Sequence, residues 1–233
     1  MQSAAATPPR APDPWPDAHP VTRLAPNLFH DLKSLPSANS AMVLAVGAAG
    51  AAAIHPADRR LADWSARSGA SSYTAAGRVF GDGWMQSGAA VATYAVGRLT
   101  NHPQVTHIGS DLIRAQVLNA VITNVIKVSV DRTRPSGAPR AFPSGHTSAT
   151  FASAAVLHAH YGWKVGAPAF AVAGFVAWSR ARDGAHLLSD VAFGSAIGVM
   201  SGRTVAASHA SRRAAVLPSP TKGGGSITFL FSR

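Results

Sequence analysis

The residues best suited to chemistry lie in three short clusters between positions 127 and 190. In chain order they are Lys127 with Arg134-Pro135, then Pro143-Ser144-Gly145-His146, then Ser179-Arg180 with His186 and Asp190. Cations and backbone N–H groups bind oxyanions, and an imidazole can attack an electrophile or transfer a proton. If the clusters converge in space, they predict a phosphoryl-transfer site that needs no metal.

The first cluster could supply two cations to one anion. Lys127 and Arg134 are seven positions apart, about two helical turns, so both side chains would point the same way if a helix persists between them. Lysine provides a compact charge, and arginine a planar fork for two oxygens. The alternative is a helix end with solvated cations, Arg132 among them.

The second cluster predicts a helix that begins at an anion site. Ser144 is placed to cap a helix from about residue 145, and a helix start offers free N–H groups and a positive dipole end. Gly145 allows close approach of the backbone, and His146 lies near enough to protonate a leaving oxygen. The alternative is an ordinary helix cap beside a surface histidine.

The third cluster pairs an imidazole with a carboxylate. His186 and Asp190 are four positions apart, so on one helix they would share a face. The carboxylate would fix the tautomer of the imidazole and stabilise its cation, leaving the opposite nitrogen free to attack. Arg180 precedes a loop and could fold back onto the same anion. The alternative is a buried His–Asp pair that only closes a helix.

The other histidines show no spacing typical of metal ligands. His158 and His160, two positions apart, would face away from each other on a helix. We therefore predict no metal site and structural or surface roles for His19, His30, His55, His102, His107, His158, His160 and His209.

The elements that must position these clusters are predicted to be helices. Apolar periodicity and the Pro and Gly positions indicate an all-α domain at 37–207, between a Pro-rich extended arm (1–36) and a basic, Gly- and Pro-containing tail (208–233). The tail ends in an alternating, strand-like segment at 226–231. The helices are expected at 37–55, 57–68, 84–98, 111–131, 145–160, 166–180 and about 185–206.

Composition narrows the function classes. The 233 residues carry a net charge of +11, which suits a phosphate ester or an anionic membrane surface. Nucleic-acid binding has only this net charge in its favour and is not predicted. There is no cysteine, which excludes disulfides and cysteine chemistry.

Most uncharged runs are shorter than the roughly 20 residues of a membrane span. We therefore expect a soluble or peripheral protein in the periplasm or otherwise outside the cytoplasm. The alternative is an integral membrane protein.

The three clusters, in this order, resemble the signature of the type 2 phosphatidic acid phosphatase superfamily, which includes bacterial class A acid phosphatases and vanadium haloperoxidases. The resemblance covers about residues 127–190. It implies a helical bundle with its site at converging helix ends. It also implies that His186 is the nucleophile and forms a phosphohistidine, that Asp190 orients it, and that His146 is the general acid. The phosphoryl oxygens would be bound by Lys127, Arg134, Ser144, Gly145 and Arg180.

The sequence therefore predicts a metal-independent phosphatase for phosphomonoesters, lipid-linked mono- or pyrophosphates included, that requires no cofactor. One alternative is a haloperoxidase in which the same pocket holds vanadate as cofactor and His186 ligates vanadium; in the phosphatase, vanadate would be an inhibitor. The other is a non-catalytic module that binds anions or a membrane surface. The oligomeric state is left open.

Overall fold

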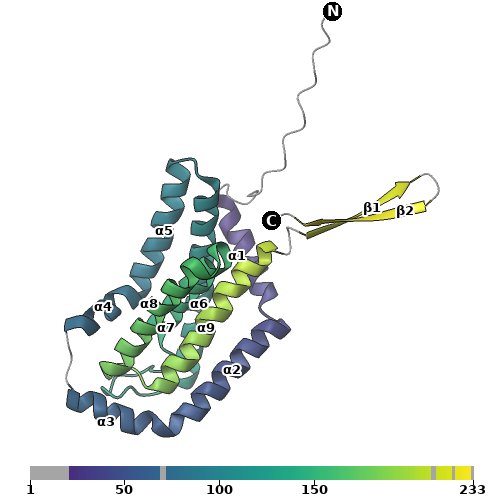
Figure 1. Ribbon diagram of the computed structural model, residues 1–233. Helices are drawn as coiled ribbons and strands as arrows, with labels where there is room; N and C mark the ends of the chain where they lie inside the picture. The colour runs from purple at the N-terminus through teal and green to yellow at the C-terminus, as the bar shows by residue number, and fades with distance from the viewer. Residues whose placement is uncertain (1–20, 69–71, 211–213, 222–223, 232–233) are drawn as a thin grey trace, which may run out of the picture.

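The computed structural model describes residues 21–68, 72–210, 214–221 and 224–231, and these are helical except for a hairpin after the last helix (Figure 1). Short 3-10 turns cover Val21–Arg23 and His55–Ala57. The helices are α1 (Leu24–Ser34), α2 (Ala38–Ile54), α3 (Asp58–Ser68), α4 (Ser72–Gly81), α5 (Gly83–Leu99), α6 (Pro103–Val130), α7 (Gly145–Tyr161), α8 (Trp163–Arg182) and α9 (Leu188–Ala210). Strands β1 (Ala214–Thr221) and β2 (Gly224–Phe231) pair antiparallel, with Ala214 opposite Phe231.

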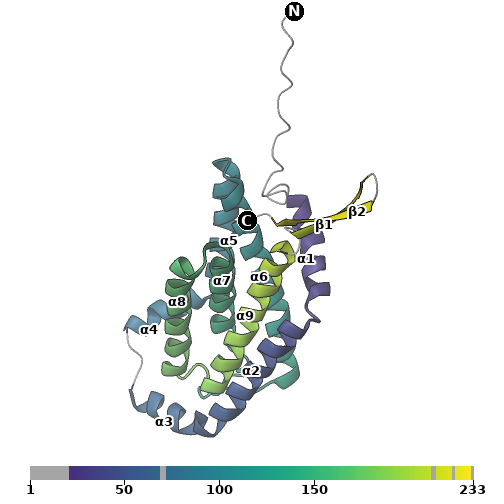
Figure 2. The ribbon, with the colours of Figure 1, turned by 45° about the vertical axis from the view of Figure 1, so that its right-hand side comes forward.

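Helices α5 to α9 run alternately up and down, so successive helix ends meet at the same end of the bundle (Figures 1 and 2). The C-terminal ends of α6 and α8 therefore lie beside the N-terminal ends of α7 and α9. This arrangement confirms the predicted all-α bundle and brings together the helix ends that carry the three clusters.

Three glycines spaced four residues apart on α9 bring it close to α7. A Cβ on Gly194 would lie 2.7 Å from the carbonyl oxygen of Ser144, and one on Gly198 would lie 2.3 Å from that of Ser148. A Cβ on Gly202 would lie 2.5 Å from the carbonyl oxygen of Ala152. Any side chain at these positions would push the helices apart, so the glycines set the distance between the second and third clusters.

The predicted helices are confirmed, with shifted ends. The arm expected to be extended through residue 36 is helical over Leu24–Ser34, whereas residues 1–20 lie outside the described residues. Helix α6 begins at Pro103 rather than near 111, since proline is well tolerated in the first helical turn. Helix α4 was not predicted.

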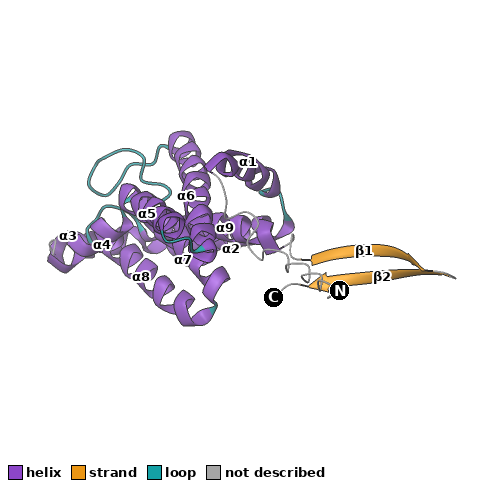
Figure 3. Ribbon diagram, turned by 90° about the horizontal axis from the view of Figure 1, so that it is seen from above, coloured by secondary structure: helices purple, strands orange, loops and turns teal. Residues whose placement is uncertain are grey.

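The strand predicted at 226–231 is confirmed within β2. Its partner β1 was not predicted, because Pro218 and Pro220 are unfavourable in strands unless they lie at an edge. In a two-stranded ribbon both strands are edges. The view from above shows the hairpin extending beyond the helices (Figure 3).

Candidate active site

The eight predicted site residues come from four helix ends and the two loops that join them. Lys127 is in the last turn of α6 and Arg180 in the last turn of α8; Gly145 and His146 open α7, and Asp190 is in the first turn of α9. Ser144 directly precedes α7. Arg134 lies in the α6–α7 loop and His186 in the α8–α9 loop.

Direct contacts join the clusters. A Cβ on Gly145 would lie 3.7 Å from Cε of Lys127, so the lysine lies over the start of α7. The backbone N–H of Ser144 donates to the carbonyl oxygen of Asp190 at 3.0 Å. Arg134 acts electrostatically on His146, Arg180 and His186. The structure thus brings all eight predicted residues together.

The expectation that a helix places Lys127 and Arg134 on one face is wrong. Helix α6 ends at Val130, and Asp131 is left-handed at φ 42°. Arg134 is held instead by a turn, in which its N–H donates to the carbonyl oxygen of Ala138 at 2.8 Å. The arginine therefore reaches the site from the loop.

The expectation that His186 and Asp190 share a helix face is also wrong, because α9 begins only at Leu188. One carboxylate oxygen of Asp190, Oδ2, accepts from the N–H of Leu187 at 2.8 Å, as the acidic residue of a capping box does. The same oxygen is 3.8 Å from Nδ1 of His186, longer than a direct hydrogen bond. The pair interacts electrostatically.

Two residues missed by the sequence analysis hold Asp190 in place. Arg132 donates to Oδ1 of Asp190 at 2.8 Å and to Asp58 at 3.0 Å. Asp58 accepts in turn from the N–H of Ser189 at 3.1 Å. Arg132 was considered only as a solvated cation, and no sequence signal indicated Asp58, which is 131 positions from Ser189. These residues position the start of α9.

Ser144 has the position of a helix cap but not the expected hydrogen bond. Its side chain makes no cap bond to the backbone; its Oγ accepts from the Thr147 hydroxyl at 3.0 Å. The first N–H groups of α7 therefore have no side-chain cap. Since such groups bind anions well, they suit a phosphoryl oxygen beside Gly145.

Some donors in the site have no hydrogen-bond partner. Nε of Arg134 and Nε of Arg180 are buried and make no hydrogen bond within the described residues. The guanidinium of Arg180 forms a 3.6 Å ion pair with Asp183. Burying a cationic donor without a partner costs free energy. An anion that bound among these groups would supply the missing acceptors.

Burial and crowded positive charge lower the pKa of the titratable groups. Burial lowers the pKa of His186, Asp190 opposes the shift, and Lys127 adds to it; the neutral imidazole is therefore favoured, and this is the nucleophilic form. Burial, then Arg180 and the charge at His186, lower the pKa of His146 to about 4. Burial and Arg134 lower the pKa of Lys127 to about 8.

The opposite end of the bundle holds a second buried polar cluster. Ligand atoms of His107, Asp111 and His160 lie within 4.8 Å of one another, an arrangement that could hold a metal ion. Asp111 also binds Arg114, which in turn binds Asp31 of α1. Spacing along the chain did not predict this grouping, because His160 comes from α7 and the other two from α6.

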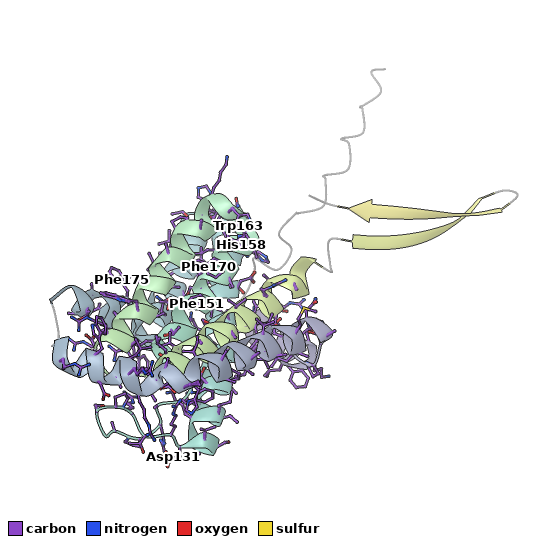
Figure 4. The ribbon with its side chains drawn as sticks, turned by 60° about the horizontal axis from the view of Figure 1, so that its bottom comes forward. Asp131, Phe151, His158, Trp163, Phe170 and Phe175 are labelled. Atoms are coloured by element: carbon purple, nitrogen blue, oxygen red, sulfur yellow. The ribbon has the colours of Figure 1, made fainter. Side chains whose placement is uncertain are left out.

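His158 packs in an aromatic group, in keeping with the structural role predicted for it. Its ring centroid is 4.4 Å from that of Trp163 and 6.1 Å from that of Phe170. Figure 4 shows these side chains gathered on α7 and α8, away from Asp131 at the site end.

Comparison with known proteins agrees with this geometry. Residues 110–214 match the PAP2 superfamily. The lipid A 1-phosphatase of Porphyromonas gingivalis is 36% identical over 99 residues, which are 40% of this chain and 22% of that relative. The chain thus spans well under half the length of this relative.

The crystal structure of a transmembrane PAP2-type phosphatidylglycerolphosphate phosphatase from Bacillus subtilis has the same fold. Its TM-score is 0.55 at 16% identity, and the match covers 79% of this chain and 92% of that one. The matched segment 110–214 includes all eight predicted site residues. Residues 110–214 therefore match the PAP2 superfamily, and the fold and the converging clusters support the predicted resemblance to its phosphatases.

Proposed function

We propose that this protein is a metal-independent phosphatase that hydrolyses a lipid-linked phosphomonoester through a phosphohistidine. The observation that carries the proposal is the cradle of Lys127, Arg134 and Arg180 around the buried, neutral His186. Both relatives are named as phosphatases of lipid phosphates, which supports hydrolysis over vanadate-dependent oxidation.

In the first step, Nε2 of His186 attacks phosphorus and the bond from phosphorus to the alcohol oxygen breaks. His146 gives its proton to that oxygen, and the alcohol leaves. In the second step, His146 takes a proton from water as the water attacks phosphorus. The P–N bond breaks, inorganic phosphate is released, and both histidines return to their starting states.

The substrate itself prepares His146 for this role. Cationic neighbours lower the pKa of the free imidazole, which by itself would leave His146 without a proton to give. A bound phosphate dianion places negative charge beside the same imidazole and raises its pKa. The general acid is therefore charged mainly in the complex, where its proton is used.

Replacing His146 with glutamine is expected to slow alkyl phosphate hydrolysis by about 10²- to 10³-fold, since a general acid contributes that much when the leaving oxygen is basic. p-Nitrophenyl phosphate, whose leaving group needs no proton, should lose much less. Phosphate release is measured in EDTA, with loss of activity in EDTA counting against metal independence. Equal losses on both substrates would remove His146 as the acid.

We further propose that the bundle is embedded in a membrane, the alternative that the sequence analysis placed second. Helix α6 is polar inside and apolar outside: Asn119 and Thr123 are buried, whereas Val121 and Val125 are 49% and 61% exposed. In water such an arrangement is unfavourable, because apolar surface is best removed from water. In a lipid environment the exposed apolar side chains contact acyl chains instead of water, and the polar side chains stay inside the bundle.

The distribution of charge supports the same placement. Each long helix is uncharged through its middle, as in Ala115–Ile126 of α6 and Val165–Ser179 of α8, and the site residues lie beyond these stretches. Several of these uncharged stretches are shorter than the roughly 30 Å hydrocarbon core of a bilayer. Lys and Arg side chains at their ends can extend to the membrane–water interface. Within the described residues, the segment Ala38–Trp64 contains an apolar window long enough to span, and little of that window is buried.

Cell membranes washed with alkaline carbonate are expected to retain the protein, and detergent to release it. A peripheral protein held by its positive charge would leave in carbonate or high salt, because that attraction is screened. Recovery of folded, active protein in the carbonate supernatant would contradict membrane embedding without affecting the proposed chemistry.

A further inference from the structure

A groove of about 450 Å³ leads from the phosphoryl site along α6, between the starts of α5 and α7. Lys127, Gly145 and His146 of the phosphoryl site are among its lining residues. His146 is the proposed proton donor to the leaving oxygen. An ester held in the cradle would therefore extend its alcohol portion into this groove.

Hydroxyl and amide side chains are distributed along the walls of the groove, among a larger area of apolar surface. Asp82, Gly83 and Trp84 line it at the start of α5, and Ala120 and Ala149 contribute apolar surface. The uncharged hydroxyl and amide side chains of the lining are Ser87, Gln116, Asn119, Thr123, Asn124 and Ser148. Such a lining is unfavourable for an acyl chain, since it offers hydrogen bonds that the chain cannot return.

Asn119 is a buried groove residue that lacks a hydrogen-bond partner for its side-chain oxygen. It is 3% exposed, and its Oδ1 has no hydrogen-bond partner within the described residues. Its neighbours in the groove are satisfied: Gln116 donates to the carbonyl oxygen of Ala149 at 2.9 Å, and Thr123 contacts the Ser148 hydroxyl at 3.2 Å. A buried amide without a partner is costly unless a bound group supplies one.

We propose that this groove binds a carbohydrate-like alcohol portion of the substrate and that Asn119 recognises one of its hydroxyl or amide groups. This inference rests on the proposed phosphatase function. Trp84 is 88% exposed at the edge of the groove, where its indole offers a flat apolar face to a sugar ring. The fatty chains of the substrate then lie outside the groove, along the exposed apolar helix faces.

The test compares Asn119→Leu with the wild type on glucosamine 1-phosphate, n-octyl phosphate and p-nitrophenyl phosphate. The variant is expected to lose about tenfold in kcat/KM on the sugar phosphate, the order of one hydrogen bond in a buried site. It should lose less than about twofold on the other two, because the phosphoryl cradle is unchanged. Asn39→Leu, the same change at an exposed position of α2, serves as the control.

Ser87→Ala, on the α5 wall of the groove, provides a second variant if Asn119→Leu unfolds; it should show the same selective loss, smaller in size. Equal losses on all three substrates, or none, would overturn the inference and leave the phosphatase proposal standing. Failure of the wild type to release phosphate from p-nitrophenyl phosphate would overturn both.

Discussion

The His186→Ala variant is expected to lose about 10⁶-fold in kcat on p-nitrophenyl phosphate, the order of effect seen when a covalent nucleophile is removed. His186 is 3% exposed, and its neutral form is favoured by burial. His146 lines the leaving-group groove and has a different role. Phosphate release and rapid-quench trapping of an acid-labile phosphoenzyme measure the effect.

The matched control is His30→Ala, the same substitution at an exposed position on α1, which should retain wild-type activity. Circular dichroism of the His186→Ala protein separates loss of chemistry from loss of fold. Full activity in a folded His186→Ala variant, or a phosphoenzyme that still forms, would end the phosphohistidine mechanism.

The Asp190→Asn variant is expected to lose about 10⁴-fold in kcat, the size of effect known for the carboxylate partner of a catalytic imidazole. Asp190 is completely buried and serves three groups: His186 through charge, the Leu187 N–H and Arg132. The asparagine amide oxygen can still accept one of the two hydrogen bonds, from Leu187 or from Arg132. The amide NH₂ group would then face the other donor. The charge that stabilises the developing imidazolium is lost entirely.

The pH profile separates this charge effect from misplacement of the loop. Asp190 raises the pKa of His186 against the effect of burial. Removing its charge lowers that pKa further, so the nucleophile becomes neutral at lower pH and the acidic limb of kcat/KM moves to lower pH. An acidic limb that stays in place would contradict the charge role.

The Asp58→Asn variant is the comparison for Asp190→Asn. The substitution weakens the hydrogen bonds that Asp58 accepts from Arg132 and Ser189, but it leaves the carboxylate of Asp190 in place. We expect a loss of about tenfold and a much smaller shift of the acidic limb. A loss as large as that of Asp190→Asn would mean that positioning, rather than charge, dominates at this site.

Local patterns predicted most of the elements and the residues of the site. The start of α7 at Gly145 follows from the Pro143-Ser144-Gly145 order, and the helices follow from apolar periodicity within single segments. These features depend on residues a few positions apart. The two errors of local geometry, at Arg134 and His186, arise because spacing alone does not show where a helix ends.

Residue types and spacing in the chain were enough to identify the phosphate-binding clusters and the all-α bundle, because both are encoded over short distances. Tertiary structure alone decided which face of α6 turns inward, and thus that Asn119 lines a groove while Val121 faces outward. It alone brought Asp58 to Ser189, and His160 to Asp111. Such contacts join segments far apart in the chain, and they depend on how helices pack against one another. Packing at α7 and α9 is set by where glycines permit close approach.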